Sequence, residues 1–102
     1  MRIICLFNLK KGVGIAEYEE WARTSDIPSV NALDSVERFT VHRATGMLGD
    51  EDAKPPFAYV EIIDISGIDA FMADAASADM QSIAAEFQGF ADAPQFIVTQ
   101  DF

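Results

Sequence analysis

Tyr59 and Glu61 have the side chains and the spacing that best suit proton-transfer chemistry. They stand two positions apart in the apolar run 57–65, so a strand would present both side chains on one face. A phenol beside a carboxylate can move protons to and from a carbonyl or an enol if burial raises the pKa of the acid. The alternative is structural, with Glu61 pairing with Arg43 or Arg38 on a neighbouring strand and fixing the register. Both interpretations stay open.

Three cationic or titratable residues occupy an alternating segment just before a long irregular loop. Histidine is a common general base in enzymes, which makes His42 a candidate, but on a solvent-facing side of the strand it is only a surface residue. Arg38 shares the parity of His42 and is a candidate ligand-binding residue. Arg43 is a candidate for holding a carboxylate or carbonyl of a ligand. Its alternative role is an ion pair with Glu61 or Asp64.

A third group of candidates belongs to the first helical segment. Tyr18 and Trp21 fall on one apolar face and serve either as core residues or as rings lining a pocket for an aromatic ligand. Asp26 stands just before Ile27 and Pro28, where the helix is expected to end or kink. Its carboxylate is predicted either to cap the backbone locally or to point into the mouth of a cavity.

Composition excludes several classes of function. Seven basic residues against seventeen acidic residues give a net charge of −10, which disfavours nucleic acid and anionic membrane surfaces as partners. No apolar run approaches the roughly 20 residues of a membrane-spanning helix, and no signal-peptide cleavage site follows the first strand. We therefore expect a cytoplasmic protein, with its acidity serving solubility.

The counts of cysteine and histidine limit metal and covalent chemistry. The lone Cys5 lies in an apolar run, which favours a buried inert thiol over a nucleophile. With His42 as the only histidine, the chain lacks the ligands of an ordinary zinc site. Neither a phosphate-binding glycine loop nor a GxSxG nucleophile elbow is present. No metal site and no cofactor are predicted.

Hydrophobic periodicity predicts a single domain over residues 1–102 with alternating strands and helices. Strands are expected at residues 2–9, 35–45, 57–65 and 95–100, and helical segments at 15–27, from Ser66 and from Ser77. In the second strand polar residues fall on both faces. The order β-α-β-β-α-β, with the second helical part split in two, is typical of a ferredoxin-like α+β fold. That fold has a four-stranded antiparallel sheet with the helices on one face.

The face of the sheet without helices is predicted to need a cover. Neither parity of the first strand is polar, and the last strand is apolar on both sides as well. An exposed patch of several hundred Å² would be unusual for a monomer. We therefore predict a homodimer that packs sheet to sheet about a two-fold axis and closes into an α/β barrel. Such a barrel leaves an apolar cavity with a few polar groups, which suits a small hydrophobic or aromatic ligand.

Motifs along nearly the whole chain resemble the RedY/HapK-like proteins of the dimeric α/β-barrel superfamily. The most distinctive are YEEWA, DIPSV, RATGMLG, YVEIIDI and EFQGFAD. Named family members belong to gene clusters for prodigiosin-type tripyrrole pigments, a pathway that is not carried over. The superfamily includes EthD-like proteins, quinol monooxygenases without a cofactor, muconolactone isomerases and haem-degrading enzymes. In EthD-like relatives a histidine is common after the helical tryptophan, where this chain has Thr24-Ser25-Asp26, which weakens any transfer of their chemistry.

Three functions are compatible with these observations. The first is an enzyme without a cofactor that acts on an aromatic or pyrrole-like carbonyl compound, with Glu61 or His42 as base, Tyr59 as proton donor and Arg43 as anion holder. The second is a carrier or regulatory protein that binds a hydrophobic molecule without transforming it. The third, an interaction module with no ligand, is the least favoured. Unpaired polar groups inside apolar strands cost about 1–3 kcal/mol each, which favours a pocket.

Overall fold

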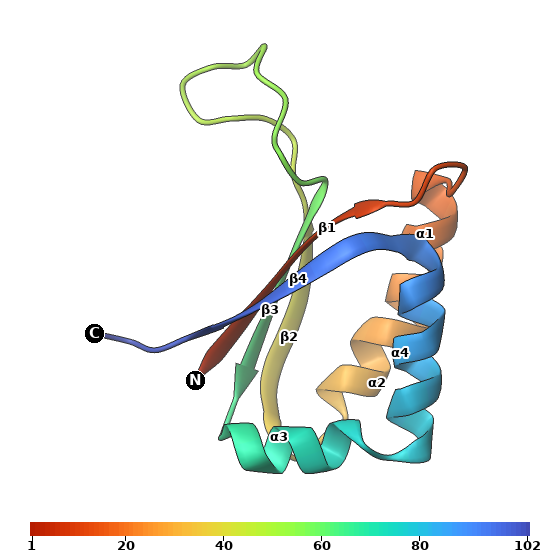
Figure 1. Cartoon of the computed structure of the whole chain (residues 1–102), viewed down its shortest axis with the longest axis vertical. Helices are drawn as coiled ribbons and strands as arrows, with labels where there is room; N and C mark the ends of the chain where they lie inside the picture. Colours follow the sequence, from red (N-terminus) through yellow and green to blue (C-terminus); the bar gives the residue numbers. More distant parts are fainter.

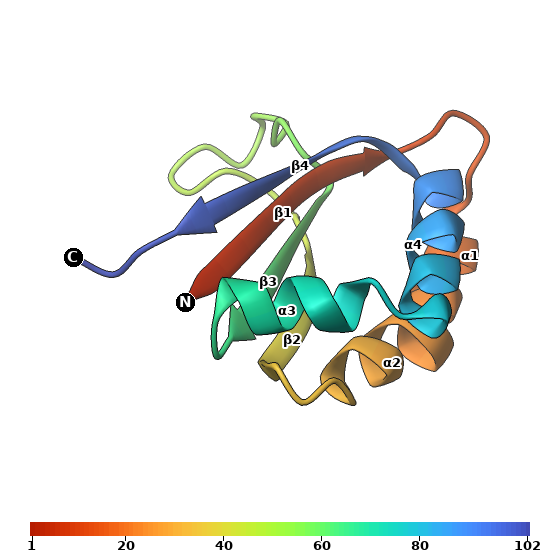
Figure 2. The same ribbon diagram turned by 60° about the horizontal axis from the view of Figure 1, so that its bottom comes forward.

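The computed structural model describes residues 1–102, and it has two layers (Figure 1). A sheet forms one layer. Helical segments cover one of its faces, and α3 closes one end of the gap between the layers (Figure 2). The elements are β1 (Arg2–Leu9), α1 (Ile15–Trp21), η1 (Ala22–Asp26), α2 (Ile27–Asn31), β2 (Val36–Arg43), β3 (Tyr59–Ile65), α3 (Ile68–Ala75), α4 (Ala78–Phe90) and β4 (Ala91–Thr99). None of the helices combines the length and the hydropathy required to span a bilayer.

The sheet has the predicted ferredoxin-like topology. Its strand order is β2-β3-β1-β4, and all neighbouring strands are antiparallel. Cys5 of β1 lies opposite Glu61 of β3, and Glu61 lies opposite Val41 of β2. Because side chains alternate along a strand, Tyr59 and Glu61 of β3 both point to the face of the sheet that the helices cover.

Alternation in β3 decides which side chains enter the core. Every second residue from Tyr59 to Ile65 is buried, including Glu61, whereas Val60, Ile62 and Asp64 on the opposite face are only half-buried. In β1 the buried set is Ile3, Cys5 and Phe7. The core therefore accepts one carboxylic acid among hydrophobic and aromatic side chains.

The first helical segment was expected to end or kink just before Pro28, and it changes from α to π geometry there without ending. The chain stays helical through η1, a π-helical turn, and continues into α2 with Pro28 in its first turn. Proline is tolerated there because the first amide groups of a helix lack partners within that helix. Asp26 makes no side-chain capping bond and is buried instead. The π-turn therefore brings a second carboxyl group to the interior, and such turns are frequent at functional sites.

Two further boundaries differ from the sequence-based prediction. The last strand begins at Ala91 rather than at residue 95, because a register irregularity and the positive φ of Ala93 (44°) let this edge strand continue past Pro94. Of the two predicted helix starts, Ser77 caps α4 by accepting a hydrogen bond from the Met80 amide. In contrast, α3 begins at Ile68 after Gly67, without a side-chain cap from Ser66.

Asn31 attaches the helical segment to the edge of the sheet. Its Oδ1 accepts a hydrogen bond from the Phe39 amide at 2.9 Å, and its Nδ2 donates to the Phe39 carbonyl at 3.0 Å. The same Nδ2 also donates to the carbonyl of Ile27. The side chain thus imitates a neighbouring strand along β2 and holds α2, and Asp26 just before it, at a fixed distance from the sheet.

We expect Asn31→Ala to lower the free energy of unfolding by about 1–3 kcal/mol, because the backbone N–H and C=O of Phe39 lose their partners. Asn31→Asp keeps the acceptor for the Phe39 amide but loses both donated bonds, so we expect it to be intermediate or closer to the alanine variant. Urea denaturation followed by circular dichroism measures both. An alanine variant as stable as the native chain would contradict this role.

Candidate functional site

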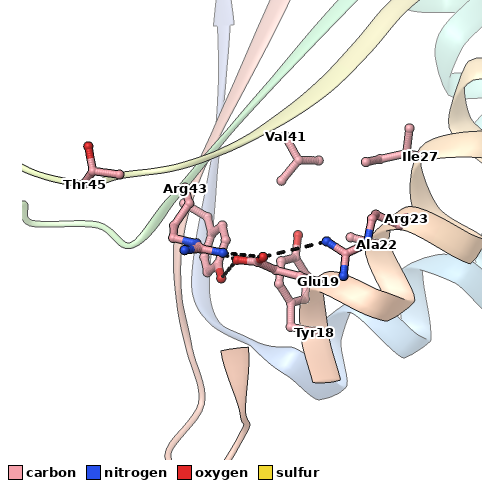
Figure 3. A pocket seen from close by; sticks show the side chains of 9 residues that line it. Tyr18, Glu19, Ala22, Arg23, Ile27, Val41, Arg43 and Thr45 are labelled. Carbon is pink, nitrogen blue, oxygen red and sulfur yellow. Dashed lines mark hydrogen bonds and ion pairs between the residues drawn. The ribbon is translucent and has the colours of Figure 1, made fainter. Parts of the chain in front are cut away.

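Two cavities lie between the helical layer and the sheet, and each has its own charged groups. The first, here named the carboxyl pocket, has a volume of about 210 Å³. It is lined by Asp26, Val30, Phe39, Glu61, Ile63, Phe71, Ala75, Met80, Ile83, Ala84, Phe87 and Phe96. The second, here named the arginine pocket, has a volume of about 300 Å³. It is lined by Tyr18, Glu19, Ala22, Arg23, Ile27, Val41, Arg43, Thr45 and Tyr59 (Figure 3).

Glu61 is the most unusual group in the carboxyl pocket. Its side chain is held by the central strand β3, only 3% of the residue is exposed, and its Oε2 atom has no hydrogen-bond partner. Burial, and next the nearby Asp26 carboxyl, raise the pKa of Glu61 to about 8, although the neighbouring Cys5 thiol partly offsets this. Glu61 is therefore a carboxyl group that can hold or release a proton near neutral pH.

Asp26 is the second acid of the carboxyl pocket. It comes from η1, on the layer facing Glu61, and only 5% of it is exposed. Burial raises the pKa of Asp26 to about 7. Of the two roles predicted for Asp26, the structure shows its carboxyl lining the cavity, and this carboxyl does not cap a helix. Two acids that titrate near neutrality in one apolar pocket provide both a proton donor and a proton acceptor.

The predicted pairing of Glu61 with Arg43 or Arg38 is wrong, because Arg43 binds a different acid. Its Nε and Nη2 atoms donate to the two carboxylate oxygens of Glu19 at 2.7 and 2.5 Å (Figure 3). Tyr59 also donates its hydroxyl hydrogen to Glu19, at 2.7 Å. Hydrogen bonds from Arg43 and then Tyr59 lower the pKa of Glu19 to about 2.

Glu19 is therefore a site residue that the sequence analysis did not single out. Its only visible signal is a helical spacing of four residues to Arg23, which indicates an ordinary surface pair. The contact with Arg43 joins α1 to β2 across 24 positions of the chain, and nothing local predicts it.

The two tyrosines near these pockets are buried, and their hydroxyl groups differ. Burial and the bond to Glu19 raise the pKa of Tyr59 to about 12, so its phenol stays protonated. The Tyr18 hydroxyl is buried without a partner, and burial raises its pKa as well. Both rings pack around Phe7, with centroids 5.4 and 5.6 Å from its own. Tyr59 and Glu61 share a strand face as predicted, but the Tyr59 ring lines the arginine pocket.

The remaining candidates lie outside both pockets. His42 is exposed on the sheet face without helices, and its Nε2 lies 2.9 Å from the Thr40 hydroxyl. Arg38, also exposed, is the cross-strand partner of Asp64 on that face. Trp21 is half-buried, packs against Phe87 and Phe90, and donates its indole hydrogen to Glu86. No three His, Cys, Asp or Glu side chains gather closely enough to hold a metal ion.

Three solved bacterial structures share this fold. HapK from Hahella chejuensis is 27% identical, with a TM-score of 0.74 over 98% of this chain and 93% of its own. A dimeric ferredoxin-like protein of unknown function from Thermobifida fusca is 20% identical, with a TM-score of 0.69 over 94% and 85%. A mutant form of SnoaB, a cofactor-independent oxygenase from Streptomyces nogalater, is 17% identical, with a TM-score of 0.69 over 99% and 93%.

The two less similar structures support the fold alone. No curated protein matches the chain. A family model described as "REDY-like protein HapK" matches residues 1–102, and the protein therefore belongs to the HapK (REDY-like) family.

Proposed function

We propose that this protein binds a small aromatic or otherwise hydrophobic metabolite in the carboxyl pocket and moves a proton on it without a cofactor. The observation that carries the proposal is the buried Glu61 carboxyl, whose Oε2 faces no partner inside an apolar cavity. A polar atom left unpaired in the core costs about 1–3 kcal/mol, and a ligand that bonds to it removes that cost.

The two acids divide the proposed chemistry between them. General acid–base catalysis is most efficient when the pKa of the group lies near the working pH, and burial has this effect on Glu61 and Asp26. The active form of the pair holds a single proton, on Asp26, and it becomes populated as pH rises toward the pKa values of the two acids. In this form ionised Glu61, with its free oxygen, takes the proton from a carbon next to a carbonyl. Asp26 in its protonated form donates to the carbonyl oxygen. The other side chains that line the pocket are hydrophobic, so the surroundings of the two acids favour their protonated forms.

The proposal changes the roles first suggested by the sequence. Tyr59 and Arg43 are bound to Glu19 and line the other pocket, so they do not act as the proton donor and anion holder beside Glu61. His42 stands on the opposite face of the sheet and takes no part. A carrier without catalysis is the second candidate, favoured by the predominance of hydrophobic residues around the two acids.

We also propose that two copies pair through the sheet face without helices. Ile4, Leu6, Val60 and Ile62 form a half-buried apolar block there, joined by cross-strand pairs. The edge strand β4 adds Ile97 to this block, because Ile97 lies opposite Ile4 and is 44% exposed. Apolar surface of this kind on a sheet is what a second copy covers. Solved neighbours with this fold are described as dimeric.

We expect the protein to accelerate exchange of the α-hydrogens of an aromatic ketone, with 1-indanone as the first probe, for deuterium in D2O. Glu61→Gln removes the base while keeping the shape, so exchange should fall about 100-fold or more. Proton NMR follows the loss of the α-hydrogen signal. Glu37→Gln, at an exposed position on β2, is the matched control and should match the native rate.

The outcomes of this experiment separate the two candidates. Binding of the ketone without faster exchange favours the carrier. Exchange that Glu61→Gln leaves unchanged would contradict the role of Glu61. A circular dichroism spectrum and an unfolding midpoint for each variant show whether it is folded, so that a lost rate is attributed to chemistry.

We expect the free energy of unfolding to fall as pH rises from about 4.5 to about 8. In this window folded Glu61 keeps a proton that the unfolded chain has lost, so the folded state binds more protons and rising pH favours unfolding. Asp26 acts in the same direction up to about pH 7. Glu61→Gln should flatten the curve, as urea denaturation at several pH values will measure. A slope equal to the native one would argue against a buried, titrating Glu61.

Ile62→Glu places a charge in the centre of the apolar block, and we expect it to convert a dimer to a monomer at micromolar concentration. Native mass spectrometry distinguishes one chain from two. Ala85→Glu, at an exposed position on α4, introduces the same charge away from the block and should leave the mass unchanged. A native chain that is monomeric under these conditions would refute the pairing.

A further inference from the structure

The polar side chains that line the carboxyl pocket are all acids. Its only polar side chains are Glu61 and Asp26, and the other lining residues carry no hydroxyl, amide or basic group. When ionised, a carboxylate accepts hydrogen bonds and donates none. Once either acid ionises, the pocket therefore offers negative charge and acceptor oxygens, and in no protonation state does it offer positive charge to an anion.

Aromatic rings from four separate elements line the same pocket. They are Phe39 of β2, Phe71 of α3, Phe87 of α4 and Phe96 of β4. The rings of Phe87 and Phe96 have centroids 6.3 Å apart and an interplanar angle of 65°, so they present differently oriented surfaces. The faces of aromatic rings attract cations within about 6 Å, most strongly where water is excluded.

We propose that the carboxyl pocket selects a hydrophobic organic cation, such as a protonated amine on a small aromatic body. The ammonium group bonds to Glu61 and Asp26, and the phenylalanine rings enclose the charge and the apolar body. This inference rests on the proposed function, because it names the ligand class of the same pocket. An anion meets like charge as soon as either acid ionises, and a neutral hydrocarbon leaves the Glu61 oxygen unpaired.

No other charged group compensates the two acids. Cys5 of β1 and Tyr18 of α1 are their buried titratable neighbours, and both are neutral when protonated. On β2, Arg43 is bound to Glu19 and Arg38 lies on the outer face. Two acids on α3 and α4 bind groups outside the pocket. Asp74 accepts a hydrogen bond from the Ser35 amide, and Glu86 accepts one from the Trp21 indole. An incoming cation is therefore the group that can neutralise the pocket.

Proton release accompanies the binding of such a cation. The two carboxyls hold protons near neutral pH, and a cation favours their ionised forms. The affinity for an amine that stays protonated should therefore increase as pH rises from about 6 to about 8. The affinity for a neutral ligand of the same shape should not follow this course.

Isothermal titration calorimetry with benzylamine, benzyl alcohol and benzoate tests the proposal on the native chain. The three probes share one ring and differ in charge. We expect benzylammonium to bind at least about 10-fold more tightly than benzyl alcohol, and benzoate to bind most weakly. Titration in two buffers of different protonation enthalpy measures the released proton. Amide chemical shifts near Glu61 and Phe87 locate the bound probe.

Variants distinguish binding in the carboxyl pocket from weak attraction of cations to the acidic surface. Glu61→Gln should weaken benzylammonium about 10-fold or more and leave benzyl alcohol within about 2-fold, and Asp26→Asn should do the same if it folds. The net charge of −10 attracts any cation weakly, so Glu37→Gln serves as the surface control and should change nothing. Loss of affinity in the control equal to that in the pocket variants would overturn the proposal.

The remaining outcomes distinguish this inference from the proposed function. Benzyl alcohol binding in the pocket as tightly as benzylammonium overturns the selection for cations and leaves the small-molecule pocket standing. Absence of all three probes from the pocket at millimolar concentration overturns both. Binding of benzylammonium that depends on Glu61, in a protein that exchanges no ketone hydrogens, supports the inference and refutes the proton-transfer activity alone.

Discussion

Two carboxyl groups, Glu61 and Asp26, are held between the sheet and the helices with no basic side chain to pair with them. An ionised carboxylate in such surroundings loses most of its hydration, so the protein accommodates it by raising its pKa and keeping the proton. This constraint shapes the rest of the interior. Aromatic rings pack around the two acids, and a cavity of about 210 Å³ lies beside them.

The positive charge of Arg43 lies in the neighbouring arginine pocket, where it pairs with Glu19. Arg43, Glu19 and Tyr59 form one hydrogen-bonded group that satisfies its own charges in the arginine pocket (Figure 3). If Arg43 instead reached Glu61, the pKa of Glu61 would fall and its free oxygen would be occupied. The separation of the two pockets therefore preserves the proton-holding state on which the proposed chemistry depends. The π-helical turn contributes to this arrangement by bringing Asp26 inward.

Much of the fold could be predicted from local patterns in the sequence. Alternation along β3, the helical periodicity around Tyr18 and the position of Ser77 all correspond to observed elements. Two boundaries near prolines were predicted less well: the first helical segment does not end before Pro28, and the last strand begins at Ala91, ahead of Pro94, and not at residue 95. A proline ends a helix or strand only where its missing N–H is needed, and the first turn of α2 and the bulged edge of β4 do not need it. At both positions the tertiary structure, and not local propensity, determined the bounds of the element.

What the sequence by itself determined is the order of the elements, the apolar character of both faces of the first and last strands, and the presence of an acid inside the apolar run of β3. These follow from periodicity and composition, which act over short stretches of chain. Only the tertiary structure decided which charges meet. The layer contacts that place Asp26 beside Glu61, and Arg43 on Glu19, join residues far apart in the chain. Burial, and with it the protonation of each acid, exists only once those layers pack together.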